Sequence, residues 1–121
     1  MTADLRKLAT EDFCYLTTVG RVSGRPHEIE IWFAIEDRTL YVLSGGRDRS
    51  DWVKNLRRNP DVTVRINGES FEGRAREVES ANEDELARRL LVEKYEQSPG
   101  RLSNWRRTAL PVAVDLTQPR A

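Results

Sequence analysis

The sequence predicts a mainly β fold of the α+β class, in which six antiparallel strands close into a small barrel with flanking helices. Six segments either are rich in aromatic and β-branched residues or alternate between apolar and polar residues, as half-buried strands do. Most of these segments are separated by turns of hairpin length, and hairpins force antiparallel pairing. Closing the strands into a barrel removes exposed edges. An open sheet covered by the longest helix is the alternative arrangement.

The strands are expected at residues 13–19, 27–35, 39–43, 62–66, 70–79 and 109–116. Asn67 and Gly68 separate the fourth and fifth, and both residue types tolerate the positive φ angles of a tight hairpin turn. In the second strand, alternation places one set of side chains on one face and the intervening set on the other. These sets are Ile29, Ile31, Phe33 and Ile35, against Glu28, Glu30, Trp32 and Ala34.

Helices are expected at residues 2–9, 50–59, 80–97 and 101–107. Ser50 is the expected N-cap of the second helix, and Pro60 follows its end, as is typical after a helix. Ser80 and Glu83 match the capping-box pattern at the start of the longest helix. One substantial helix therefore lies between the fifth and sixth strands.

The composition limits the class of protein. A chain of 121 residues fits one domain, residues 1–121. Twenty Lys plus Arg balance twenty Asp plus Glu, so no global attraction to nucleic acid is expected.

Cys14 is the single cysteine, which excludes an internal disulfide and favours a reducing compartment. The sequence contains neither a signal peptide nor an apolar run of the roughly 20 residues that span a bilayer. We therefore expect a soluble, cytoplasmic protein.

The segment from residue 20 to residue 25 is the first candidate site. Gly20 and Gly24 allow a sharp turn and a close approach of the backbone to a ligand. Ser23 adds a hydroxyl donor, and Arg21 and Arg25 add forked cationic donors. Together these groups suit a phosphate. The alternative is an ordinary hairpin loop with solvated arginines.

The second candidate site begins at Ser44. Gly45 and Gly46 again permit close backbone approach, and the start of the following helix offers free N–H groups. The basic residues of that helix, which fall at helical spacing, are Lys54, Arg57 and Arg58. By themselves they match an ordinary exposed surface. Trp52 is more often a core anchor than a cofactor platform, and Asn55 is either a ligand or a capping residue.

Other chemistry has little support. His27 is the only histidine, so no metal site is expected, and an edge or surface position is favoured for it. Cys14 lies among apolar residues and is expected in the core. Glu28 and Glu30 are expected to face solvent or to pair with arginine. The chain has no GxSxG, GxGxxG, P-loop or CxxC motif, which leaves hydrolytic and nucleoside-triphosphate chemistry without support.

Three stretches of the chain, taken in order, resemble the deazaflavin-dependent nitroreductase family. They are Thr17-Thr18-Val19-Gly20-Arg21-Val22-Ser23-Gly24-Arg25-Pro26, then Leu43-Ser44-Gly45-Gly46, then Asp51-Trp52-Val53-Lys54-Asn55-Leu56-Arg57-Arg58-Asn59-Pro60-Asp61-Val62. The resemblance covers about the first two thirds of the chain. It implies the split β-barrel of flavin-binding proteins that are similar to pyridoxamine 5′-phosphate oxidase. Family members often carry a Lys within the Ser-Gly-Gly segment, and this chain does not.

The resemblance implies coenzyme F420 as the cofactor, an 8-hydroxy-5-deazaflavin with a phosphate and an oligoglutamate tail; FMN is the alternative. On the family pattern, the loop that begins at Gly20 meets the phosphate and tail, and the segment that begins at Ser44 borders the ring. The cofactor-binding residues carried over are Thr18, Gly20, Arg21, Ser23, Gly24, Arg25, Pro26, Ser44, Gly45, Gly46, Trp52, Lys54, Asn55 and Arg58. Ser44 is the candidate for a catalytic role.

The implied reaction is hydride transfer between the reduced deazaflavin and a small organic acceptor such as a quinone, a nitroaromatic compound or an enone. The acceptor is expected beside aromatic side chains, namely Tyr15, Trp32, Tyr95 and Trp105. A homodimer is also expected, with no nucleic acid partner. The alternatives are an FMN-dependent oxidoreductase on the same fold and a binding protein that carries a flavin or deazaflavin without turnover.

Overall fold

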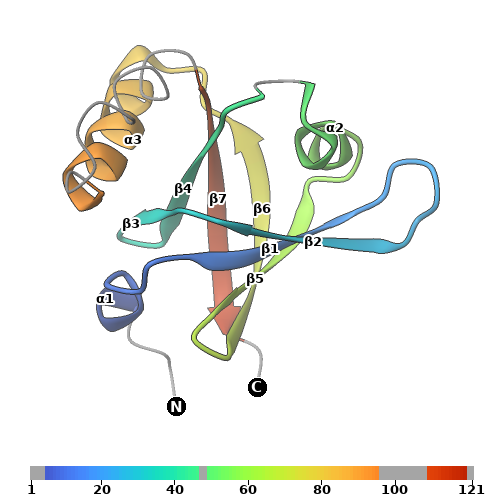
Figure 1. Ribbon diagram of the computed structural model, residues 1–121, viewed down its shortest axis with the longest axis horizontal. Coiled ribbons are helices and arrows are strands. Elements are labelled where there is room, and N and C mark those ends of the chain that lie inside the picture. The colour runs from blue at the N-terminus through green and yellow to red at the C-terminus, as the bar shows by residue number, and fades with distance from the viewer. Residues whose placement is uncertain (1–4, 47–48, 96–108, 120–121) are drawn as a thin grey trace.

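The computed structural model describes residues 5–46, 49–95 and 109–119 of the protein. These residues form one seven-stranded antiparallel sheet with the strand order β2-β1-β5-β6-β7-β4-β3. The strands are β1 (Cys14–Val19), β2 (Pro26–Ile31), β3 (Ala34–Glu36), β4 (Thr39–Ser44), β5 (Asp61–Ile66), β6 (Glu69–Glu77) and β7 (Leu110–Pro119). The helices are α1 (Leu5–Leu8), α2 (Asp51–Arg58) and α3 (Ala81–Lys94). Figure 1 shows α2 and α3 on opposite sides of the molecule, with β4, β7 and β6 running crosswise to β1 and β2.

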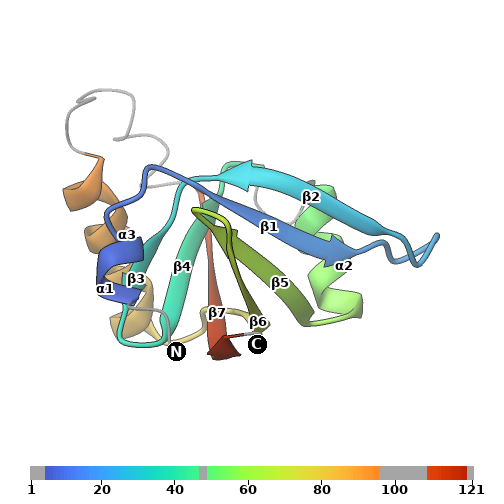
Figure 2. The same ribbon diagram turned by 90° about the horizontal axis from the view of Figure 1, so that it is seen from below.

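The predicted mainly β antiparallel fold is confirmed, but the predicted number of six strands is wrong. The segment 27–35 is not one strand, because β2 pairs with β1 whereas β3 pairs with β4 at the other edge of the sheet. Trp32 and Phe33 carry the chain from one edge of the sheet to the other. Because only two residues separate the two edge strands, the sheet has to curl into a split barrel (Figure 2).

The backbone of Phe33 is held by side chains of α3 and not by a neighbouring strand. The Phe33 N–H donates to the Tyr95 hydroxyl at 3.1 Å, and that hydroxyl donates to the Asp12 carbonyl at 2.6 Å. Lys94 Nζ donates to the Phe33 carbonyl at 2.9 Å and lies 3.6 Å from the centre of the Phe33 ring. Partial burial lowers the pKa of Lys94 to about 8. The bend is therefore fixed by hydrogen bonds from a distant part of the chain.

The predicted alternation of side chains continues through the bend. Phe33 and Ile35 pack in the main core with Ile29 and Ile31. Ala34 points to the opposite face, where α3 buries it in a second core. The charged residues that share this face in the sequence suggest exposure, but the face is buried at Ala34. The second core consists of Ala34, Tyr41, Leu43, Ala87, Leu91, Ala109 and Ala113. Both faces of the sheet are thus buried where α3 covers it.

The turn and cap predictions have different outcomes. Asn67 and Gly68 have φ angles of 48° and 82°, which confirms the tight hairpin turn between β5 and β6. Ser80 caps α3, since its Oγ accepts from the Glu83 N–H at 3.3 Å. Ser50 occupies the N-cap position of α2 but makes no side-chain cap. The predicted N-cap residue is thus confirmed, but its Oγ lies 2.9 Å from Ser44 Oγ instead of bonding to the helix.

The remaining elements agree with the prediction to within a few residues; α1 is described at Leu5–Leu8, and residues 2–4 of the predicted first helix lie outside the described residues. The predicted helical segment at 101–107, the predicted end of the longest helix near 97, and Trp105 lie outside the described residues. Of the helices that the structure describes, none combines the length and the apolar composition needed to cross a membrane.

Replacing Tyr95 by Phe is expected to destabilise the fold by about 1–3 kcal/mol, because the buried Phe33 N–H would lose its acceptor. Urea denaturation measures the change. Tyr15→Phe is the matched control, since the Tyr15 hydroxyl bonds only to the exposed Glu30 carboxylate and should change stability by less than about 0.5 kcal/mol. Equal effects of the two substitutions would contradict the role of Tyr95.

Glu83 is expected to make the stability pH-dependent in the acid range. Arg76 and the Tyr41 hydroxyl hydrogen-bond its carboxylate and lower its pKa to about 2. An exposed glutamate has a pKa of about 4.3. The folded pKa is the lower one, so the stabilisation is present above about pH 4.3 and is lost as the pH falls towards 2.

Glu83→Gln should therefore cost on the order of 1–2 kcal/mol at pH 7 and progressively less below about pH 4. Urea denaturation of both proteins at pH 7 and pH 3 tests this, with Glu85→Gln on the exposed side of α3 as the control. A difference that stayed constant between the two pH values would contradict the assignment.

Candidate functional site

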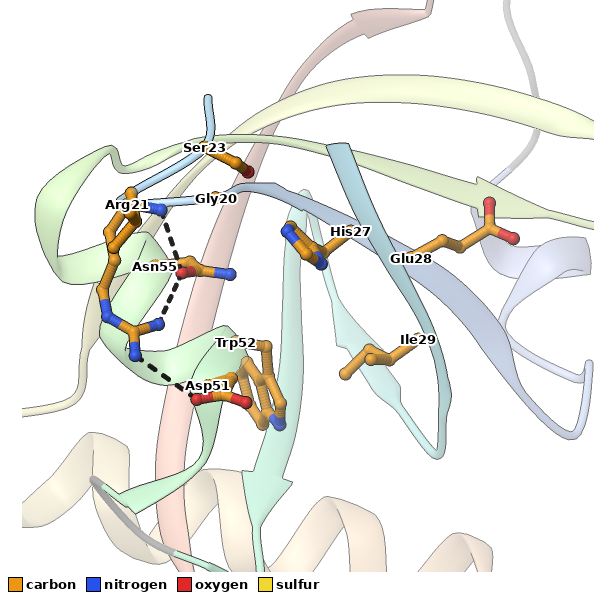
Figure 3. Close-up of a pocket in the computed structure, with 10 residues that line it drawn as sticks. Gly20, Arg21, Ser23, His27, Glu28, Ile29, Asp51, Trp52 and Asn55 are labelled. Carbon is orange, nitrogen blue, oxygen red and sulfur yellow. Dashed lines mark hydrogen bonds and ion pairs between the residues drawn. The ribbon is translucent and has the colours of Figure 1, made fainter. Parts of the chain in front are cut away.

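A pocket of about 490 Å³ lies between the β1–β2 loop, strand β2 and the first turns of α2. Its lining residues come from three segments, namely Gly20, Arg21, Val22 and Ser23; His27, Glu28 and Ile29; and Asp51, Trp52 and Asn55 (Figure 3). Both sequence-predicted segments contribute to it, since residues 20–23 and α2 form two of its three sides. Of the third side, β2, only Pro26 at its start was predicted as part of a site.

Asn55 fixes the position of the loop against α2. Its side-chain Oδ1 accepts hydrogen bonds from the Arg21 backbone N–H at 3.2 Å and from Arg21 Nη1 at 2.9 Å. Its Nδ2 donates to Thr18 Oγ1 at 3.2 Å. Asn55 is 3% exposed and Thr18 is fully buried, so these bonds are shielded from water. Asn55 therefore caps the neighbouring β1–β2 turn, and a contact from Asn55 to a ligand stays a prediction.

The loop itself is a compact turn. The Gly20 N–H donates to the Arg25 carbonyl at 2.8 Å, and the Gly24 N–H donates to the Gly20 carbonyl at 2.9 Å. Gly24 has a φ of 73°, in the left-handed region that glycine adopts without strain. Ser23 Oγ accepts from the Arg25 N–H at 3.1 Å. These bonds leave the hydroxyl proton of Ser23 available to a ligand.

Two polar side chains converge beside Gly20. A methyl group added at Gly20 would lie 2.7 Å from Ser23 Oγ and 2.8 Å from His27 Nε2. The absence of a side chain at position 20 thus allows a hydroxyl and an imidazole to pack directly against the backbone. His27 comes from β2, where it stands opposite Thr18 of β1.

The opposite part of the pocket is apolar. Figure 3 shows His27 and Ile29 pointing from β2 towards α2, while Glu28 between them points away. Glu28 instead pairs with Arg65 at 3.3 Å, as the sequence predicts for this carboxylate. Ile29 and Trp52 are both partly buried against the main core. The pocket therefore combines a polar end near Gly20 with an apolar wall.

The basic residues around the pocket fall into two groups. Arg21 is already paired, since Nη2 lies 3.4 Å from Asp51 Oδ1 in addition to its bonds to Asn55. Arg25, Lys54 and Arg58 are exposed, and none of them forms an ion pair with another described residue. Lys54 and Arg58 lie one turn apart on α2. These three cations are therefore available to an anion.

The predicted binding residues occupy different positions. Those that line the pocket are Gly20, Arg21, Ser23, Trp52 and Asn55. Thr18 lies behind the pocket and holds Asn55. Gly24, Arg25 and Pro26 complete the loop and the start of β2, and Lys54 and Arg58 lie on the exposed surface of α2. The structure thus brings the two predicted segments together without placing every residue in the pocket.

Ser44, Gly45 and Gly46 lie outside this pocket, in the connection that leads to α2. Ser44 is 2% exposed, and its hydroxyl faces that of Ser50. A methyl group at Gly46 would lie 2.6 Å from Ser50 Oγ, so this glycine allows a close approach within the protein. The catalytic role of Ser44 stays a prediction.

Sequence reasoning missed five residues that line the pocket, namely Val22, His27, Glu28, Ile29 and Asp51. His27 was expected at an edge or on the surface, and β2 is indeed an edge strand. The alternation of side chains along β2 could have predicted that His27 lies on the same face as Ile29. Both residues share the inner face with the neighbouring β1 residues Leu16 and Thr18.

Three of the four aromatic residues proposed for an acceptor lie outside this pocket, and Trp105 lies outside the described residues. Trp32 stacks on Tyr95 with ring centres 4.3 Å apart, at the bend between β2 and β3. Tyr15 lies on the outer face of β1, beneath the guanidinium of Arg65. Cys14 is fully buried, as predicted, and burial raises its pKa to about 12. Among the described residues, no three His, Cys, Asp or Glu side chains are grouped as metal ligands are.

Residues 3–117 match a family model described as F420H2-dependent quinone reductase. The chain belongs to this F420H2-dependent quinone reductase family. Membership confirms the resemblance to F420-dependent reductases that residues 17–62 indicate, and it places the protein among the F420-dependent reductases. The comparison with curated proteins found no match.

Solved structures confirm the fold. An F420H2-dependent reductase is 23% identical with a TM-score of 0.67, and the match covers 88% of this chain and 94% of that one. A candidate pyridoxamine 5′-phosphate oxidase from Listeria innocua is 22% identical with a TM-score of 0.72, over 96% and 92% of the two chains. A protein described as a domain-swapped dimer is 24% identical with a TM-score of 0.70, over 85% and 79%.

Asn55→Ala is expected to destabilise the protein by about 2–4 kcal/mol, because the buried Thr18 hydroxyl and the Arg21 N–H would lose their partner. Urea denaturation gives the free energy, and amide hydrogen exchange reports whether residues 20–25 open. Lys54→Ala, one residue earlier on α2 but exposed, is the control and should change neither quantity measurably. Unchanged exchange in the loop of Asn55→Ala would contradict the connecting role of Asn55.

Proposed function

We propose that this family member binds coenzyme F420 in the pocket between the β1–β2 loop, β2 and α2, and transfers hydride from the reduced coenzyme to a quinone. The family description supports both the coenzyme and the acceptor. The observation that carries the proposal is a 490 Å³ pocket with an apolar wall and polar side chains, together with three exposed cations on its loop and on α2 that form no ion pair among the described residues.

The residues present fit an anionic flavin-like molecule. A side chain at position 20 would come within 2.7 Å of Ser23 Oγ and 2.8 Å of His27 Nε2, so the glycine allows these two polar groups to lie close to the backbone of the loop. Arg25, Lys54 and Arg58 supply positive charge that no carboxylate in the described part of the chain neutralises. A phosphate and an acidic tail need both kinds of group.

The protein provides orientation and electrostatics to this reaction. When bound, reduced F420 supplies the hydride. Trp52 and Ile29 form an apolar wall suited to an aromatic ring system, and that wall reduces the access of water. Asn55 keeps the loop in register with α2, so that the donors around Gly20 stay in place. Ser44, which lies outside this pocket, stays the predicted hydrogen-bonding contact to the ring or to the acceptor.

Two other functions use the same fold, namely an FMN-dependent oxidoreductase and a protein that carries a flavin or deazaflavin without turnover. The absence of the Lys that relatives often have in the segment at Ser44 is the reason to test FMN directly. A homodimer is also proposed, and the neighbour described as a domain-swapped dimer supports it.

Titration of the purified protein with F420 and with FMN is expected to show saturable and tighter binding of F420. Oxidation of reduced F420 should then depend on added menadione, since hydride needs an acceptor. Fluorescence of the deazaflavin measures binding, and its absorbance measures turnover. As a control, Arg57→Ala removes one positive charge from α2 and should leave the affinity for F420 unchanged. Arg57 pairs with Glu77 on the side of α2 away from the pocket.

Each alternative has its own outcome. Tighter binding of FMN would replace the proposed coenzyme. Saturable binding of F420 without menadione-dependent oxidation would identify a carrier instead of an enzyme. Binding of neither compound would overturn the proposed function altogether.

A further inference from the structure

We propose that the outer face of the sheet, formed by β2, β1, β5 and β6, binds a second copy of the chain about a two-fold axis. In this arrangement the Tyr15 and Arg65 side chains of each copy enter a groove beside Thr63 of the other copy. The inference rests on the homodimer proposed above and assigns its interface. It does not depend on the identity of the coenzyme, because the coenzyme pocket lies between α2 and the inner side of β2.

In the part of the chain that the structure describes, neither long helix covers this face. α2 packs on the inner side of the sheet, where its Leu56 belongs to the main core. α3 covers β3, β4 and β7, where it forms the second core. On β1 and β5 the outward side chains alternate with core residues, namely Cys14, Leu16, Val62 and Val64. The outer face of β2, β1, β5 and β6, which includes one border of the molecule in Figure 2, is therefore open to a partner.

The middle of this face is a row of threonines. Thr17 of β1 stands opposite Thr63 of β5, and both are half-buried. On β5 the residues two positions to either side of Thr63 are Asp61 and Arg65, which carry opposite charges. When two copies meet face to face about a two-fold axis, a residue on one side of the axis meets the residue on its other side. An axis along the threonine row therefore brings Arg65 of one copy to Asp61 of the other.

A ridge lies on one side of this row and a groove on the other. The Arg65 guanidinium lies 4.5 Å from the centre of the Tyr15 ring, so these two side chains form a single ridge. The groove has a volume of about 550 Å³. Its lining residues are Val19, Asp61, Val62, Thr63, Glu72, Gly73, Arg74 and Thr117. The same axis places the ridge of each copy over the groove of the other.

The charges of the ridge and the groove are complementary. The groove contains two carboxylates, those of Asp61 and Glu72. Asp61 lies 3.4 Å from Arg74, yet its side chain is 77% exposed and remains accessible to a second cation. Arg65 lies 3.3 Å from Glu28 in its own chain, and a forked guanidinium can bind a further carboxylate. Because Tyr and Arg are also enriched in protein interfaces, the chain itself supplies the partner that fits this groove.

Exposed apolar side chains at the two ends of the β1–β2 hairpin fit the same axis. Phe13 directly precedes β1 and Trp32 directly follows β2, and these side chains are 40% and 38% exposed. Val22, in the loop at the other end of the hairpin, is 93% exposed. The axis crosses the hairpin between these ends, so each end lies towards the opposite end of the second copy. Association therefore removes apolar surface from water.

Sedimentation equilibrium of the full chain over a range of concentrations measures the dimer. Asp61→Arg and Arg65→Glu should each weaken it about tenfold or more, because like charges would then face each other across the axis. The double variant restores opposite charges and should recover at least part of the affinity. Glu85→Arg, on the exposed side of α3, is the control and should leave the dimer unchanged. Urea denaturation of each variant shows that the fold is retained.

A chemical cross-link tests the position of the axis. Facing sheets pack about 10 Å apart, so a bis-maleimide of about that length should join the two copies of Thr63→Cys. The native Cys14 is fully buried and does not compete for the reagent. Glu85→Cys, treated in the same way, is the control and should stay a single chain.

The outcomes separate this inference from the proposed function. A wild type that stays monomeric at all concentrations would overturn the inference without affecting F420 binding. A dimer that resists both charge reversals and that Thr63→Cys does not cross-link pairs through another face, which also overturns it. A dimer that passes both tests supports the inference even if the protein binds no F420.

The monomeric variants also test whether pairing is separate from the coenzyme pocket. Asp61→Arg at a concentration where it is monomeric should bind F420 within about twofold of the wild type, since His27 and Ile29 point to the inner side of β2. Loss of F420 affinity in this variant, with its stability unchanged, would show that the coenzyme site extends across the interface and would overturn that separation.

Discussion

The architecture depends on a two-residue connection between the two edges of the sheet. β2 and β3 are consecutive in the chain, yet they pair at opposite ends of the strand order. A flat sheet of seven strands, spaced about 4.8 Å apart, would separate its edges by nearly 30 Å, which two residues cannot span. Curling is therefore required. Tyr95 and Lys94 stabilise the bend by binding the backbone of Phe33, which has left both neighbouring strands.

The same curl positions the site. It brings the inner face of β2 over α2, so that His27 and Ile29 face Trp52 and Asn55 across the pocket. The β1–β2 hairpin has its register set by β1, and its loop is held by the hydrogen bonds of Asn55. A buried amide with every polar group bonded is rigid and specific in its partners. The pocket thus joins a hairpin, residues 14–31, and a helix, residues 51–58, that are separate in the sequence, and neither forms it alone.

Local sequence signals predicted most elements because each had a local physical cause. Asn67 and Gly68 accept positive φ angles, and Ser80 accepts the Glu83 N–H regardless of the rest of the fold. The bend at Phe33 was not predictable in this way. Its residues alternate as in one strand, and the partner that replaces the strand hydrogen bonds, Tyr95, lies 62 positions away. Ser50 shows the same limit, since its hydroxyl prefers Ser44 to the helix it precedes.

The candidate site shows why residue type alone does not give a role. The loop contains two arginines that look equivalent in the sequence, and both suit an anion. In the structure Arg21 is bound to Asn55 and Asp51, whereas Arg25 is exposed without an ion pair among the described residues. His27, a single histidine without a motif, lies against Gly20 and lines the pocket because strand alternation and pairing with Thr18 place it there. Whether a polar side chain serves the fold or a ligand is thus decided by its partners in space, and those partners are fixed by the curl of the sheet.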